Sequence, residues 1–134
     1  MLRGSCLCGG VRYEVLGELH RPLYCHCSMC RKAHGTAFRA RGGVKASEFR
    51  FTSGEELLTY FESSPGNHRG FCKRCGTPIL SRFDFDRQWL GLPLGALDDD
   101  PGVKPSMHVF VGSKAPWFDI NDSLAQYEAL PPQT

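Results

Sequence analysis

The chain lacks any long hydrophobic run, since no stretch of about twenty apolar residues occurs in its 134 residues. No apolar segment follows its first charged residue, Arg3, so no secretory signal is visible. A large net charge is also missing, because the formal value is only +2. We therefore expect a cytoplasmic protein with no membrane partner, and the small charge gives no support to nucleic acid as a partner.

Helical periodicity is equally scarce, since it never persists for ten residues, whereas period-two alternation recurs along the chain. Val11, Tyr13 and Val15 alternate with Arg12 and Glu14, as in a half-buried strand. Other short apolar runs are bounded by turn residues and lie at Leu57–Phe61, Ile79–Phe83, Trp89–Leu94 and Met107–Val111. The pattern predicts a mainly β fold of twisted antiparallel sheets with little helix, forming one domain over residues 1–130 and a frayed tail over residues 131–134.

Seven cysteines are present, and this odd number excludes a closed set of intramolecular disulfides. They form three groups with the spacing of metal ligands: CLC at residues 6–8, CHCSMC at 25–30 and CKRCG at 72–76. A CxC pair on a regular strand would point its sulfurs apart. The glycines at positions 9 and 10 therefore predict a backbone bend after Cys8, and Gly76 predicts a turn with positive φ.

Structural zinc sites take four ligands, whereas reactive zinc sites keep three protein ligands and one open position. Seven sulfurs divide naturally in this way, which predicts two zinc ions per chain. The structural zinc would take Cys6, Cys8, Cys72 and Cys75, and the open zinc site would take Cys25, Cys27 and Cys30. The first set would join the start of the chain to its middle and cross-link a thin core.

The alternative for the second group is a closed structural site that a histidine completes. The candidates by position are His20, His26, His34 and His68. His26 stands between two ligands and is expected to face away from the metal. His34 is a candidate either for a temporary fourth ligand or for a group that contacts the metal ligands without binding the metal. His108 alternates with apolar residues as a buried imidazole would.

These motifs together resemble a known family. The segments are GSCLCGGVRYEV, CHCSMCRKAHGTAF, GFCKRCGTPI, GALDDDPG and MHVFVGSKAPWF, which run in order from about Gly4 to about Tyr127. They resemble the glutathione-dependent formaldehyde-activating enzyme family, which includes centromere protein V. The resemblance implies a β-tent fold, a structural zinc on the four cysteines and an open catalytic zinc on the other three.

The family activity implied by this resemblance is the joining of formaldehyde to glutathione, which is carbon–sulfur lyase chemistry of the S-(hydroxymethyl)glutathione synthase type. A thiol bound at the open position would be held as its reactive thiolate. The anionic site and an anionic thiol need cations nearby, and the segment from Arg21 to Arg50 carries a charge of +6. Its candidate substrate-binding residues are Arg31, Lys32, Arg39 and Arg41, although two arginines on one strand are ordinarily a solvated face.

A second hypothesis is a non-catalytic, zinc-linked binding module whose partner is a protein or a nucleic acid. The basic segment from Arg21 to Arg50 would be its contact surface. The low total charge and the lack of a basic stripe interleaved with aromatic residues argue against nucleic acid. The lyase with a small thiol and an aldehyde as substrates is therefore the preferred interpretation.

Overall fold

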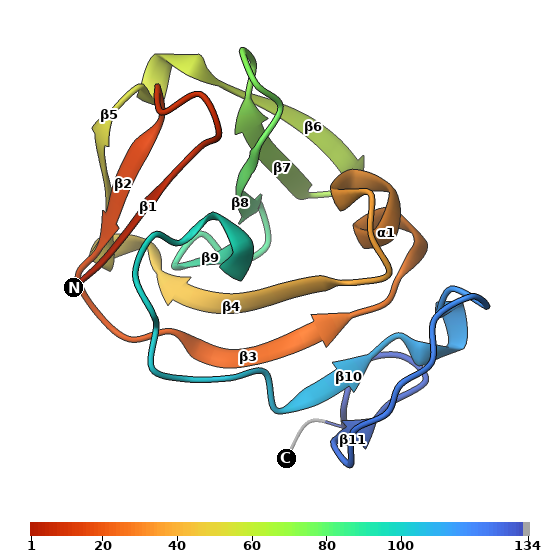
Figure 1. Ribbon diagram of the computed structural model, residues 1–134. Coiled ribbons are helices and arrows are strands. Elements are labelled where there is room, and N and C mark those ends of the chain that lie inside the picture. The colour runs from red at the N-terminus through yellow and green to blue at the C-terminus, as the bar shows by residue number, and fades with distance from the viewer. Residues whose placement is uncertain (133–134) are drawn as a thin grey trace.

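The computed structural model describes residues 1–132, which form two β-sheets and one short α-helix (Figure 1). The smaller sheet is antiparallel and has the strand order β1-β2-β5, with bounds Leu2–Ser5, Arg12–Val15 and Phe49–Ser53. In Figure 1 this sheet stands at the left of the molecule, and the N-terminus lies at its lower end.

The larger sheet has eight strands in the order β11-β10-β3-β4-β9-β8-β7-β6. Its strands are β3 (His20–Cys25), β4 (Arg39–Lys45), β6 (Leu58–Ser64), β7 (Asn67–Cys72), β8 (Pro78–Phe83), β9 (Trp89–Pro93), β10 (Met107–Val109) and β11 (Ala125–Gln126). Figure 1 shows β3 and β4 crossing the lower half of the view, while β6, β7 and β8 lie in its upper half and run in other directions, so the sheet is strongly twisted.

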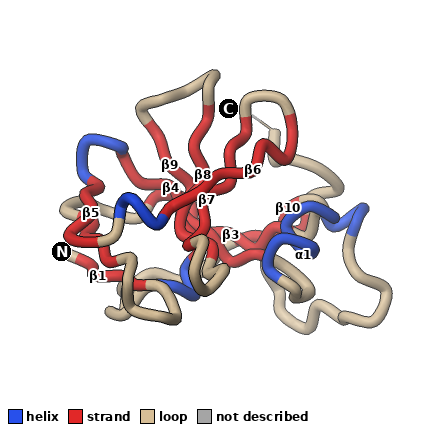
Figure 2. The backbone as a smooth tube through the Cα atoms, turned by 90° about the horizontal axis from the view of Figure 1, so that it is seen from above, coloured by secondary structure: helices blue, strands red, loops and turns tan. Residues whose placement is uncertain are grey.

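Helical structure is confined to short segments, which Figure 2 shows between the strands and loops. The α-helix is α1 (Ser28–His34), and the 3₁₀ turns are η1 (Ala46–Glu48), η2 (Glu55–Leu57), η3 (Leu94–Ala96) and η4 (Val111–Ser113). The predicted mainly β fold with little helix is therefore confirmed. No helix in residues 1–132 has the length and apolar character needed to cross a membrane.

The main core lies between the two sheets. Val11, Tyr13 and Val15 are buried while Arg12 is exposed, as the period-two alternation predicts. They pack in one cluster with Val44, Ile79, Leu92 and two of the cysteines, Cys6 and Cys72. Cys6 and Cys72 thus belong to the main core, whereas Cys75 is half-buried and Cys8 is exposed.

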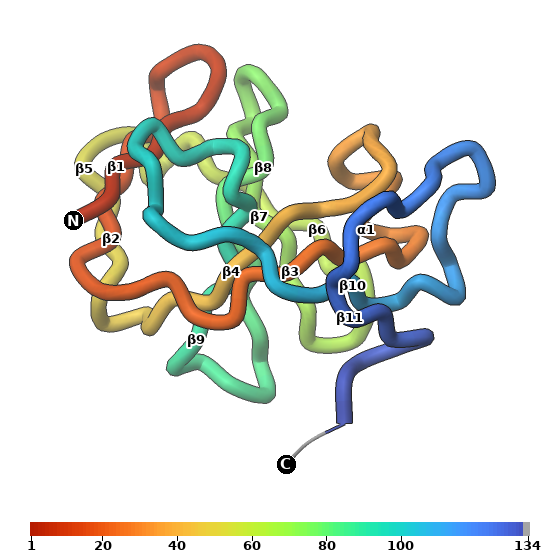
Figure 3. Tube along the Cα trace, turned by 60° about the horizontal axis from the view of Figure 1, so that its bottom comes forward, coloured from red at the N-terminus to blue at the C-terminus, as the bar shows by residue number. Residues whose placement is uncertain are grey.

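The pairing of β10 departs from the predicted antiparallel arrangement, because β10 runs parallel to both β3 and β11. The chain leaves β9 and crosses the sheet by the long connection of residues 94–106 before it reaches β3. A connection of that length permits parallel pairing, which a tight hairpin excludes. Figure 3 shows the C-terminal segment, in blue, lying beside β3 and α1.

A second, smaller core forms there from Leu23, Cys25, Cys30 and Val109. The single domain over residues 1–130 stays a prediction. Of the predicted frayed tail, residues 133 and 134 lie outside the described residues.

Candidate metal centres and the adjoining cavity

Four cysteines from distant parts of the chain meet where the main core reaches the surface. The sulfurs of Cys6, Cys8, Cys72 and Cys75 all lie within 4.8 Å of one another. Two turns permit this arrangement. One places Gly9 at φ 76° after the CxC pair, and the other places Gly76 at φ 80°, where its N–H donates to the Cys72 carbonyl at 2.7 Å.

The spacing of these sulfurs fits a tetrahedral zinc ion, which holds sulfurs about 3.8 Å apart when each Zn–S bond is about 2.3 Å. The Cys6 and Cys8 sulfurs are 3.5 Å apart, and those of Cys8 and Cys72 are 3.9 Å apart. A hydrogen bond with the Thr77 hydroxyl lowers the pKa of Cys75 to about 5, which favours the thiolate that a metal requires. All seven cysteines of the chain are free thiols.

The second cluster is local, since the sulfurs of Cys25, Cys27 and Cys30 lie within 4.8 Å of one another at the junction of β3 and α1. Cys27 is the N-cap of α1, and its sulfur accepts a hydrogen bond from the Cys30 N–H at 3.3 Å. Cys25 and Cys30 are buried. Hydrogen bonds from Cys25 and Cys27, together with the Arg69 guanidinium, lower the pKa of Cys30. Hydrogen bonds with Cys27 and Cys30, together with burial, raise the pKa of Cys25.

The histidine alternatives are placed elsewhere by the structure. Within residues 1–132, no histidine nitrogen joins the three sulfurs in the 4.8 Å group. His20 packs edge-on against Trp89, and His68 lies with Glu62 and Asp84 in a separate, more exposed ion-paired group. His34 lies at the end of α1, where burial and the neighbouring Arg39 lower its pKa to about 4.

His26 faces away from the sulfurs, as its position between two ligands predicts. Its Nε2 lies 2.8 Å from Nδ1 of His108, whose Nε2 lies 2.9 Å from Asp122. Burial, reinforced by His108, lowers the pKa of His26 to about 4, so the ring is neutral near pH 7. This buried chain ties the CHC segment to β10 and to the C-terminal loop.

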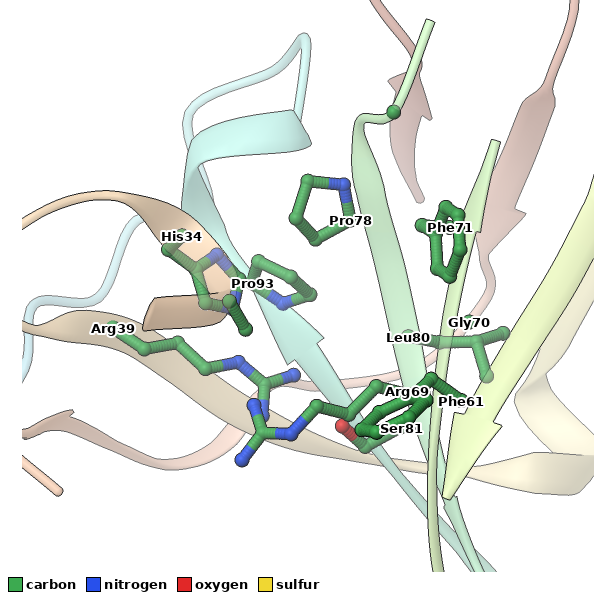
Figure 4. Close-up of a pocket in the computed structure, with 12 residues that line it drawn as sticks. His34, Arg39, Phe61, Arg69, Gly70, Phe71, Pro78, Leu80, Ser81 and Pro93 are labelled. Carbon is green, nitrogen blue, oxygen red and sulfur yellow. The ribbon is translucent and has the colours of Figure 1, made fainter. Parts of the chain in front are cut away.

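A cavity of about 410 Å³ lies near the three-cysteine cluster, although none of the three cysteines is among its lining residues. Two arginine side chains enter it from different strands, Arg39 from β4 and Arg69 from β7, and Figure 4 shows their guanidinium groups directed toward each other. Arg69 also reaches the cluster, because its Nη2 lies 3.6 Å from the Cys30 sulfur. The remaining lining residues are Ala33, His34, Phe61, Gly70, Phe71, Gly76, Pro78, Leu80, Ser81 and Pro93.

The four predicted cationic residues have different positions. Arg39 lines the cavity and is only 5% exposed, so it is not the solvated residue that a surface strand would carry. Burial lowers the pKa of its guanidinium to about 10. Arg41 packs over Gly91, since a Cβ there would lie 3.1 Å from its Nη1. Arg31 and Lys32 lie on α1 and do not line the cavity.

Arg69 is the residue that sequence reasoning misses. It lies in β7, three residues before Cys72, in a segment whose alternation is interrupted by Gly70. The only available signal is its position two residues before Phe71 on a strand that leads into the CxxC turn. That signal does not show that β7 carries Arg69 to the first turn of α1.

The fold and the two thiol clusters define a class: a mainly β protein with four sulfurs gathered at the border of its core and three more near a cationic cavity. Comparison with known proteins places the chain in a family. The family described as glutathione-dependent formaldehyde-activating enzyme matches residues 1–113, and the chain belongs to that family. This confirms the predicted resemblance and places the chain among carbon–sulfur lyase-type enzymes.

Individual relatives are moderately similar. A Halomonas elongata protein bearing the family's name is 30% identical over 131 residues, which is 90% of this chain and 81% of that protein. An Aspergillus flavus protein bearing the same name is 28% identical over 113 residues, and the match spans only 59% of its length. A crystal structure of a Rhodobacter sphaeroides protein superposes with a TM-score of 0.58 at 28% identity, covering 77% of this chain and 91% of that one.

Proposed function

We propose that the protein is a zinc-dependent carbon–sulfur lyase that joins a small thiol to an aldehyde, or releases it, at the three-cysteine cluster. Two zinc ions are bound per chain, a structural one by Cys6, Cys8, Cys72 and Cys75, and a catalytic one by Cys25, Cys27 and Cys30. The family name makes glutathione and formaldehyde the first pair to test.

One observation carries the proposal: within residues 1–132, three sulfurs gather without a fourth protein ligand, and Arg69 connects them to a cavity whose only charged lining residues are arginines. A structural zinc site has four protein ligands, so a three-ligand set suits an ion that accepts a substrate atom. Bound zinc would supply a Lewis acid that holds the substrate sulfur as a thiolate.

The residues of the chain have separate tasks in this reaction. The sulfur adds to the carbonyl carbon, the C=O double bond becomes a C–O single bond, and the proton of the thiol ends on that oxygen. Arg39 balances the charge of thiolates and substrate, and Arg31, Lys32 and Arg41 add positive potential around the cluster. His34 is neutral near pH 7 and lines the cavity, so its imidazole can carry the proton between sulfur and oxygen.

The test measures the exchange rate between ¹³C-formaldehyde and its glutathione adduct by NMR, with and without the zinc-loaded protein. We expect the protein to accelerate exchange at least tenfold. The variant Cys27→Ser should abolish the acceleration, because serine caps α1 equally well but offers no thiolate. Ser28→Ala is the matched control on the same turn. Exchange at the protein-free rate, or full activity of Cys27→Ser, would contradict the proposal.

A further inference from the structure

Two guanidinium groups meet at the inner end of the cavity without a carboxylate partner. Arg39 donates from Nη2 to the Gly91 carbonyl at 3.3 Å, and its buried Nε has no hydrogen-bond partner. Arg69 donates from Nε to the Ser63 hydroxyl at 2.8 Å, and its buried Nη1 is also unpartnered. Within residues 1–132, neither arginine forms an ion pair with an aspartate or a glutamate.

Such a pair is electrostatically unfavourable unless an anion joins it. A buried charge is stable only when it is paired and hydrogen-bonded, and two like charges raise each other's energy. The Cys30 sulfur, 3.6 Å from Arg69 Nη2, supplies part of the balance. Each guanidinium carries five N–H bonds, so both arginines keep N–H groups that no protein acceptor uses and that a ligand anion can accept from.

The rest of the cavity has the opposite character. Its walls are formed mainly by apolar side chains, among them Phe61, Phe71, Pro78, Leu80 and Pro93. Figure 4 shows Pro78, Leu80 and Phe71 on the side opposite Arg39. No acidic side chain is among the lining residues of the described chain, so a ligand ammonium group would find no carboxylate there.

We propose that this cavity binds a small carboxylic acid with an apolar body, whose carboxylate bridges the guanidinium groups of Arg39 and Arg69, and that the thiol substrate belongs to this class as a mercaptocarboxylate. The second part rests on the proposed function, whereas the first does not. Arg69 joins the two sites: one nitrogen faces the carboxylate and another touches Cys30. A thiol group that is only a few bonds from the carboxylate of the same ligand is therefore directed to the cysteine cluster.

Glutathione fits the cavity less well than such an acid. It carries two carboxylates and an ammonium group, and its peptide bonds would lie against apolar walls. An arylalkyl mercaptocarboxylate instead places one anion on the arginine pair and an apolar group against the aromatic and proline side chains. The arginine pair thus acts in substrate selection, and Arg69 is a specificity-determining residue that the cysteine motifs do not reveal.

The carboxylate site is tested first without any thiol. Calorimetric titration of the zinc-loaded protein compares 3-phenylpropanoate with its neutral amide, which has nearly the same shape. We expect the acid to bind at least tenfold more tightly, and Arg69→Met to remove that preference while leaving amide binding unchanged. Arg87→Met is the control, because Arg87 is exposed and its loss changes the net charge equally.

Equal binding of acid and amide by the unaltered protein would overturn the carboxylate site, even if Arg69→Met does not fold. An equal loss in Arg69→Met and Arg87→Met would also overturn it, because only the overall charge would then matter.

The substrate class is tested on the cobalt-substituted protein through the visible absorption of the metal. We expect 2-mercapto-3-phenylpropanoate to change the spectrum at a concentration at least tenfold below that needed for glutathione. Tighter binding of glutathione would overturn the mercaptocarboxylate assignment. A spectrum unchanged by every thiol would contradict the proposed function but leave the calorimetric result, and with it the carboxylate site, standing.

Discussion

Cys27 combines two structural roles in one side chain. Its sulfur caps α1 by accepting the Cys30 N–H, and it lies within 4.8 Å of the other two sulfurs of the cluster. Serine preserves the cap but not the metal ligand, so Cys27→Ser should keep the fold while the zinc content falls from two ions to one. Metal analysis together with the thermal unfolding midpoint checks this, and a shift of only a few degrees is expected.

Cys72 differs from Cys27 in that it lies fully buried in the main core and joins β7 to the N-terminal cysteines. Cys72→Ser would leave a buried hydroxyl and remove a ligand that holds distant segments together. We expect a loss of structure at room temperature, since structural zinc sites contribute on the order of 10 kcal/mol to folding. A folded Cys72→Ser protein with near-native circular dichroism would show that the four-cysteine site is dispensable.

Gly54 packs against the backbone of Gly10, directly after the CxC pair. Its φ is 76°, and a Cβ there would lie 2.1 Å from the Gly10 carbonyl oxygen, which belongs to the backbone and cannot move away. Gly54→Ala should reduce the free energy of unfolding by on the order of 2–3 kcal/mol. Gly95→Ala is the matched control, since nothing lies within 4 Å of its added Cβ. Urea unfolding of both variants measures the difference.

Some residues of the two sites could be predicted from the sequence alone, and others could not. Spacing alone predicts which cysteines gather, because the geometry of a metal ligand set is short-range and the turns carry glycine at positions 9 and 76. Arg69 was not predictable, because its role depends on the register that pairs β7 with β6 and β8. Register is a property of the whole sheet rather than of the segment.

Among the elements, hydrogen bonds connect the segment just before α1 to β10 and to the C-terminal loop. His26 is bonded to His108, and His108 is bonded to Asp122. His108→Leu would leave Nε2 of His26 buried without a partner and loosen the segment that carries Cys25 and Cys27. A chelator should then remove zinc from the three-cysteine site several times faster, with release from the four-cysteine site unchanged. Asp119→Asn is the control on the same loop, and equal release rates in both variants would rule the coupling out.

The stability of the folded protein depends on pH through His34 at the end of α1, whose pKa is lowered to about 4 from an ordinary value near 6.5. Between these values the unfolded chain binds a proton at His34 that the folded protein does not, so this contribution makes stability rise with pH. We expect stability to fall more steeply between pH 6.5 and pH 4 in the unaltered protein than in His34→Gln. Metal loss at low pH affects both proteins and cancels in the comparison; parallel curves would contradict the prediction.

The elements themselves were partly predictable. Period-two alternation identified β2, because one face of that strand is buried. Short apolar runs bounded by turn residues identified β6, β8, β9 and β10 of the larger sheet. The parallel pairing of β10 with β3 was not predictable, since it depends on the path of the connection over residues 94–106. The short α1 carries too few residues for a periodic signal, and its cap is a cysteine rather than a usual N-cap residue.

For the whole molecule, binding of two zinc ions would change the sign of the charge. The bare sequence has a formal net charge of +2, whereas seven thiolates and two divalent zinc ions together would bring it to −1. Removal of zinc under reducing conditions should therefore reverse the direction of migration in native electrophoresis near pH 7.5. An unchanged mobility would mean that the thiols are not held as thiolates by metal.

Cobalt titration followed by addition of a thiol is the decisive measurement of whether four sulfurs hold a structural ion and three hold a reactive one. We expect two cobalt ions per chain with tetrahedral thiolate spectra, and a thiol-induced change that corresponds to one of them and is absent in Cys27→Ser. A single bound ion, or a spectrum that no small thiol alters, would contradict this expectation.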